Sequence, residues 1–170
     1  MDDKQKQLAE GLLHAIKGER DGYSFYMMAA NSTEDTQGKE IFERLAREEH
    51  DHMLFLKKQY DALVKNGKID DSLTLGRPGQ LSETSPIFSE NFKTRLRDGH
   101  YEMTALSISI RLELDSMTYY RQQAKAAAEP GVKKFYTELA DWENGHYQAL
   151  LRQQDELKDD YWAAGGFAPF

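Results

Sequence analysis

The stretch Leu45-Ala-Arg-Glu-Glu-His-Asp-His52 decides the fold of this 170-residue chain. It is echoed 94 positions later by Leu139-Ala-Asp-Trp-Glu-Asn-Gly-His146. Each stretch contains Glu-x-x-His, and residues three apart lie on one face of a helix. The sequence therefore indicates two similar helices, each presenting a carboxylate and an imidazole to the same side.

The repeat extends outward from these stretches to whole helical hairpins. The same offset of 94 needs no gap between residues 10 and 64 of the first half, and it pairs Glu19 with Glu113 and Tyr26 with Tyr120. Internal repeats of this length usually correspond to one supersecondary unit. We therefore expect two helix–turn–helix hairpins that pack about a pseudo-twofold axis.

Breaker residues divide the chain into long helices. Strong helix formers dominate, and apolar residues recur at helical spacing with no convincing strand alternation. Asp35 or Thr36 is a candidate N-cap, Gly67 a terminating glycine, and Pro130 a first helical residue. We predict an all-α fold with helices at about 3–31, 37–66, 101–128 and 131–160, a connection at 67–87 and a short helix at 89–97.

The hairpin geometry brings six polar side chains together. Residues equally distant from a turn lie level in an antiparallel hairpin, and Glu19 and Glu49 are centred on position 34, in a polar loop. Glu113 and Glu143 are centred on position 128, beside a Pro-Gly break. A Glu from each of two helices and a Glu-x-x-His from each of the other two form the ligand set of di-iron carboxylate bundles. The predicted metal ligands are Glu19, Glu49, His52, Glu113, Glu143 and His146.

The charges of this set favour a dinuclear metal site. Four buried carboxylates repel one another, whereas two divalent cations would balance their charge. Carboxylate and imidazole ligands suit iron or manganese better than calcium, and zinc is a further substitute. A single Glu-x-x-His more often lies on a solvent-exposed helix face and binds no metal. Two copies, each with leucines on the same face, as Leu45 and Leu56 are for Glu49, favour the buried metal site.

Composition excludes several other functions. The 22 basic and 29 acidic residues give a net charge of −7, which disfavours nucleic acid or an anionic membrane as the main partner. The chain has no cysteine, hence no thiolate metal site, disulfide or thiol nucleophile. It shows no membrane-spanning run and no secretory signal, so we expect a cytoplasmic protein. We expect one domain over residues 1–163 and a C-terminal tail over 164–170.

These motifs together resemble a known family. Glu19…Tyr26, Glu113…Tyr120 and the two Glu-x-x-His stretches are similar to the rubrerythrin-like branch of the ferritin-like superfamily, over about residues 5–158. The resemblance implies a left-handed four-helix bundle with a long crossover between the second and third helices. It implies two iron ions, bridged by carboxylate, oxo or hydroxo groups, on the six predicted ligands. It places Tyr26 and Tyr120 near the metals, either as core packing or as hydrogen-bond donors to a ligand carboxylate.

The chain also departs from that family in two ways. Rubrerythrin proper has a rubredoxin domain with four cysteines, so this chain would need an external electron donor, such as a rubredoxin-type protein or a reductase. Rubrerythrins have an extra carboxylate three residues after the third-helix ligand, where this chain has Ser116.

Three functions are compatible with this sequence. The first is a redox enzyme whose diferrous centre reacts with hydrogen peroxide or dioxygen. The second is a ferroxidase or iron-storage protein, and the third a metal-stabilised bundle with a non-catalytic binding role. We expect a homodimer, and we expect the apolar tail with Trp162, Phe167 and Phe170 to be covered by the bundle or by a second chain.

Overall fold

The computed structural model describes residues 1–76 and 86–164, and these residues form helices with no strand among them. The predicted all-α fold is confirmed, and the four long helices lie close to their predicted bounds. The predicted tail contacts of Phe167 and Phe170 lie outside the described residues. The elements are α1 (Asp3–Ser32), α2 (Thr36–Asn66), α3 (Glu90–Thr94), the 3₁₀ turn η1 (Leu96–Asp98), α4 (His100–Ala126) and α5 (Pro130–Ala164).

Local sequence signals set the helix ends. Asp35 is the N-cap of α2, and its side chain accepts a hydrogen bond from the Gly38 amide. Gly67 ends α2 in the left-handed conformation, with φ of 73°, which glycine adopts without steric cost. Pro130 is the first residue of α5, where its missing N–H leaves no helical hydrogen bond unmade.

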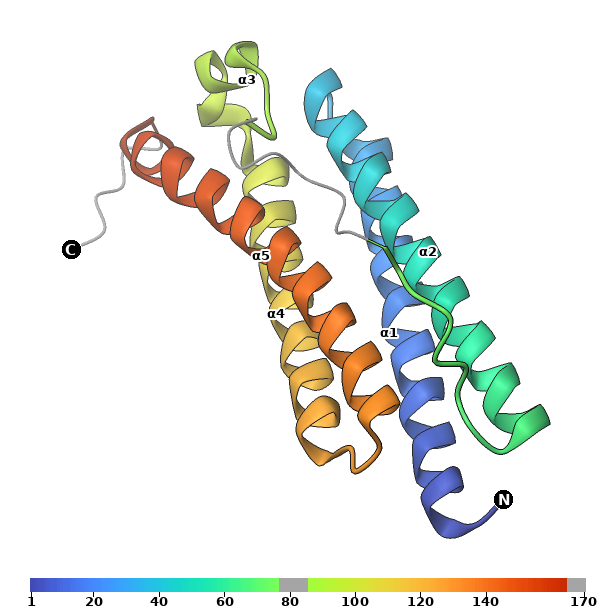
Figure 1. Cartoon of the computed structure of the whole chain (residues 1–170). Coiled ribbons are helices and arrows are strands. Elements are labelled where there is room, and N and C mark those ends of the chain that lie inside the picture. Colours follow the sequence, from blue (N-terminus) through green and yellow to red (C-terminus); the bar gives the residue numbers. More distant parts are fainter. Residues whose placement is uncertain (77–85, 165–170) are drawn as a thin grey trace.

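The long helices form the two predicted hairpins. Helix α1 packs along α2, α4 packs along α5, and the hairpins meet along α1 and α4 (Figure 1). The chain leaves α2 at one end of the bundle and enters α4 at the other end, as the long crossover requires (Figure 1). No helix in the described part of the chain has the length and hydropathy of a membrane span.

The core consists of two apolar layers with a polar band between them. One layer contains Leu45 and Leu150, and the other contains Leu56 and Leu139; all four side chains are fully buried. These leucines flank the two Glu-x-x-His motifs on α2 and α5. The layers therefore keep water away from the middle of the bundle, where the predicted ligands lie.

Candidate metal centre

All six predicted ligands lie in the polar band and are between 1% and 4% exposed. Each long helix contributes at least one of them, so the site depends on how both hairpins pack. Helix α1 contributes Glu19, α2 contributes Glu49 and His52, α4 contributes Glu113, and α5 contributes Glu143 and His146.

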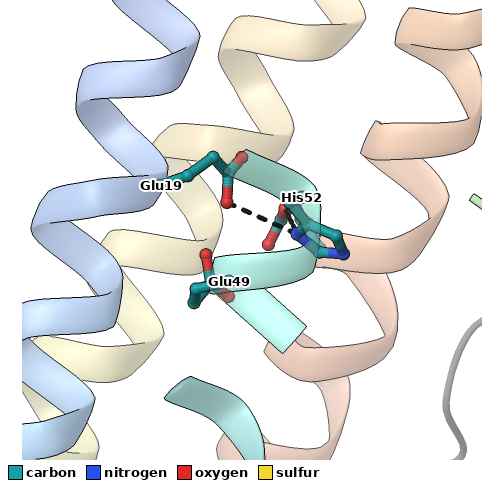
Figure 2. Close-up of side chains that lie close together, drawn as sticks. Glu19, Glu49 and His52 are labelled. Carbon is teal, nitrogen blue, oxygen red and sulfur yellow. Dashed lines mark ion pairs between the residues drawn. The ribbon is translucent and has the colours of Figure 1, made fainter. Parts of the chain in front are cut away.

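His52 turns one ring nitrogen toward the carboxylates. Its Nδ1 lies 3.1 Å from Oε1 of Glu143 and 3.4 Å from Oε2 of Glu19. Figure 2 shows Glu19, Glu49 and His52 converging on one space, with the dashed line joining Glu19 to His52. The first half of the site thus has three helices around one imidazole.

His146 makes the corresponding arrangement in the second half. Its Nδ1 lies 3.5 Å from Oε1 of Glu49, 3.5 Å from Oε2 of Glu113 and 3.7 Å from Oε2 of Glu143. The two imidazole rings are stacked with centroids 6.0 Å apart. Both histidines therefore present Nδ1 to the carboxylates of the band, and Glu143 lies near both of them.

The ligand atoms divide into two overlapping groups. Glu19, Glu49, His52 and Glu143 offer atoms that lie within 4.8 Å of one another, and Glu49, Glu113, Glu143 and His146 do the same. Glu49 and Glu143 belong to both groups. Two adjacent cation positions that share two carboxylates are consistent with a dinuclear metal site.

The hydrogen bonding of the site tests whether a metal fits. Buried polar atoms in proteins normally have a partner, because an unpaired one costs free energy. Here several buried atoms have no hydrogen-bond partner among the described residues, and six of them lie within the two groups. These six are Glu19 Oε2, Glu49 Oε1, Glu143 Oε1, Glu143 Oε2, His52 Nδ1 and His146 Nδ1. Such lone-pair donors around one space suit two bound cations.

The pKa shifts at the site show that protons must balance the carboxylate charge when no cations are bound. Burial raises the pKa of Glu49 well above its ordinary value, and burial raises the pKa of Glu113 to about 8. Burial by itself lowers the pKa of His52 and His146, but the adjacent carboxylates outweigh it and raise both. Burial likewise opposes ionisation of Glu143, yet the charge of His52 lowers the pKa of Glu143. The metal-free cluster therefore holds protons that cations would displace.

Two tyrosines tie the hairpins together at the site. The Tyr26 hydroxyl on α1 donates to Oε1 of Glu113 on α4, and the Tyr120 hydroxyl on α4 donates to Oε1 of Glu19 on α1. Burial raises the pKa of both phenols, and the charge of the adjacent carboxylate raises it further. Both hydroxyls therefore stay protonated and fix the orientation of a carboxylate from the other hairpin.

Glu48 is a site residue that sequence reasoning missed. Its Oε2 lies 2.5 Å from Nε2 of His146, on the side of the ring that faces away from the other carboxylates. Its position directly before Glu49 was the available signal, but its target on α5 depends on the docking of the hairpins. Ser116, at the position where the resemblance implies a further carboxylate, is part-buried.

Gly22 on α1 leaves room for Glu49. A Cβ added there would lie 3.2 Å from Oε2 of Glu49 and 3.5 Å from its Cδ. Gly18 is one turn earlier on the same helix, and a Cβ there would contact nothing within 4 Å. The two glycines thus form a matched pair for testing the space around the cluster.

We predict that Gly22→Ala weakens divalent-metal binding several-fold, because the methyl group displaces the Glu49 carboxylate by a few tenths of an ångström. Gly18→Ala should leave metal binding unchanged and stabilise α1 by about 0.5–1 kcal/mol through its helix propensity. Metal titration and thermal unfolding of both variants measure these effects. Equal metal affinity in the two variants would show that Gly22 does not provide this space.

A four-helix bundle that encloses two overlapping Glu/His groups defines the class of ferritin-like proteins with a dinuclear metal site. Comparison with family models gives a match to the family described as Rubrerythrin over residues 10–103. That match covers more than half of the chain, and the chain belongs to the rubrerythrin family. Searches of curated proteins and of solved structures gave no significant match.

Proposed function

We propose that this chain is a di-iron oxidoreductase that reduces hydrogen peroxide, with dioxygen as the alternative oxidant. The observation that carries the proposal is the pair of overlapping ligand groups with shared Glu49 and Glu143. Their mixed carboxylate and imidazole donors match the preference of iron or manganese. Two bound iron(II) ions would supply two electrons, with which hydrogen peroxide and two protons give two molecules of water.

The chain's own residues position the metal ions, keep protons on the tyrosine hydroxyls and exclude water from the site. The four carboxylates provide the negative charge that holds two divalent cations in the bundle. The Tyr26 and Tyr120 hydroxyls keep Glu113 and Glu19 oriented through hydrogen bonds from the opposite hairpin. The leucine layers on both sides keep the polar band dry, so the interactions within it are little screened.

The electrons for repeated turnover would come from a separate donor. The 170 residues contain no cysteine, and a rubredoxin-type centre needs four of them. We propose a rubredoxin-type protein or a reductase as this donor. Iron storage is the competing function, in which the same site would oxidise iron that then accumulates in the protein.

Rapid mixing of the iron(II)-loaded protein separates these functions. We expect peroxide to oxidise the bound iron on the time scale of rapid mixing. An added reductant should then restore iron(II) over many cycles, with two irons bound per chain. Protein loaded with zinc, which has no redox chemistry, is the control. Iron loading far above two per chain would instead support storage, and no reaction with either oxidant would contradict the proposed function.

A further inference from the structure

The pseudo-twofold repeat is broken directly beside the metal centre. The residue before Glu49 on α2 is Glu48, whereas the residue before Glu143 on α5 is Trp142, 94 positions later. Each of these two side chains crosses to the histidine of the other helix. Only one of the two histidines therefore has a carboxylate partner on its Nε2 atom, although the six predicted ligands obey the repeat.

His146 is held by a carboxylate. Glu48 Oε2 lies 2.5 Å from Nε2 of His146, and the Glu48 side chain is only 14% exposed. A carboxylate at this distance accepts a hydrogen bond from the Nε2–H group. The proton then stays on Nε2, and the Nδ1 lone pair is directed at the ligand cluster. Carboxylate partners of this kind make an imidazole a stronger metal ligand.

His52 is held by an indole ring. Trp142 lies edge-to-face against His52, with centroids 5.1 Å apart and an angle of 83° between the rings. The same indole lies farther from His146, with centroids 6.5 Å apart. His52 Nε2 is buried and has no hydrogen-bond partner among the described residues, and an indole offers an N–H only its π face, which is a weak acceptor. For Nδ1 of His52 to bind a cation, the ring must carry its proton on Nε2, where no oxygen or nitrogen atom of the described residues accepts it. This arrangement weakens His52 as a ligand relative to His146.

We propose that Glu48 and Trp142 make the two metal positions unequal, so that the position with His146 fills first and the position with His52 fills second. Glu48 is a positioning residue in this scheme, because it acts on the metal through His146. The proposal rests on the proposed function only in that the cluster binds two divalent cations. The ordered filling would make the His52 position the exchangeable one.

A zinc titration of the full chain labelled with ¹⁵N-histidine tests the order of filling. Zinc is diamagnetic and binds imidazole and carboxylate, so the Nδ1 signal of each histidine reports its own position. We expect the first equivalent of zinc to shift the His146 signal and the second to shift the His52 signal. Simultaneous shifts of both signals, or His52 shifting first, would overturn the proposal.

Variants of Glu48 test its role. Glu48→Ala should weaken zinc binding at His146 by about 10- to 100-fold, the usual cost of losing such a partner. Glu48→Gln should cause a smaller loss, because the amide oxygen still accepts the hydrogen bond but carries no charge. The control is Glu40→Gln, the same change at an exposed position of α2. Thermal unfolding of the zinc-free variants shows whether each is folded.

The outcomes separate this inference from the proposed function. Unchanged zinc affinity at His146 in folded Glu48→Ala would overturn the role of Glu48. Two zinc ions of equal affinity would overturn the ordered filling while leaving the dinuclear site intact. Ordered zinc binding in a protein whose iron form does not react with peroxide would support the inference and contradict only the proposed function.

Discussion

Glu143→Ala should strongly weaken the binding of both metal ions. Its two carboxylate oxygens face different histidines: Oε1 lies 3.1 Å from Nδ1 of His52, and Oε2 lies 3.7 Å from Nδ1 of His146. Glu143 is also a member of both ligand groups. Since losing an outer partner of a ligand costs about 10- to 100-fold in affinity, losing this shared ligand should cost more than about 100-fold at each position.

Glu19→Ala is the matched comparison for this prediction. Glu19 is a buried glutamate at the same level of the bundle, but it belongs only to the group that contains His52. We therefore expect Glu19→Ala to retain one ion per chain, at the position with His146. Equilibrium titration with manganese or zinc, with circular dichroism to verify the helices, measures both variants. Full binding in Glu143→Ala, or loss of both ions in Glu19→Ala, would contradict the assignment of a shared ligand.

Removing the metal ions should lower thermal stability, and the loss should grow as the pH rises. The pKa of Glu113 is raised to about 8 in the fold, so between about pH 5 and 8 the folded metal-free protein keeps a proton that the unfolded chain releases. The pKa of Glu49, His52 and His146 is raised as well. Stability from these groups is present at low pH and is lost as the pH rises through their folded pKa values.

Glu143 contributes to the pH dependence of stability with the opposite sign, but in another range of pH. Its pKa is lowered, so its contribution is present above its ordinary pKa of 4.5 and is lost only as the pH falls toward acid. Between pH 6 and 9 the raised groups therefore decide the slope, and the melting temperature of metal-free protein should fall. Bound cations replace the protons, and their affinity rises with pH because protons compete less with the cations for the ligand atoms.

The size of the stability difference follows from mass action. Each ion present at 1,000 times its Kd stabilises the fold by about 4 kcal/mol. Two ions would raise the melting temperature of a chain of this length by about 20 °C. Calorimetric melts of chelated and zinc-loaded protein at pH 6, 7, 8 and 9 measure both effects. An equal melting temperature with and without metal, or a metal-free melting temperature that rises over this range, would contradict the buried carboxylate cluster.

The sequence predicted the helices because their ends are marked by local chemistry. Asp35, Gly67 and Pro130 act within a few residues of themselves, so their effects need no knowledge of packing. The repeat of 94 residues supplied the tertiary information, because it indicated two hairpins. The midpoints of those hairpins then placed Glu19 level with Glu49 and Glu113 level with Glu143. The division into one domain over 1–163 and a tail stays a prediction, as do the homodimer and the ligand roles themselves.

Contacts between the two hairpins could not be predicted in the same way. Tyr26 and Tyr120 each donate to the carboxylate of the opposite hairpin, and that choice depends on how α1 docks against α4. The contact of Glu48 with His146 is also made between hairpins. The repeat did carry a signal for it, since Glu48 aligns with Trp142 and the two differ in chemistry. Which histidine each side chain reaches is visible only in the assembled bundle.

The metal content of the protein tests the central claim most directly. The full chain would be loaded with iron(II) without oxygen, freed of unbound iron by gel filtration and measured by elemental analysis. The overlapping ligand groups predict two iron ions per chain. A folded chain that retains no iron, or that retains a single ion at saturating iron, would contradict a dinuclear metal centre in the bundle.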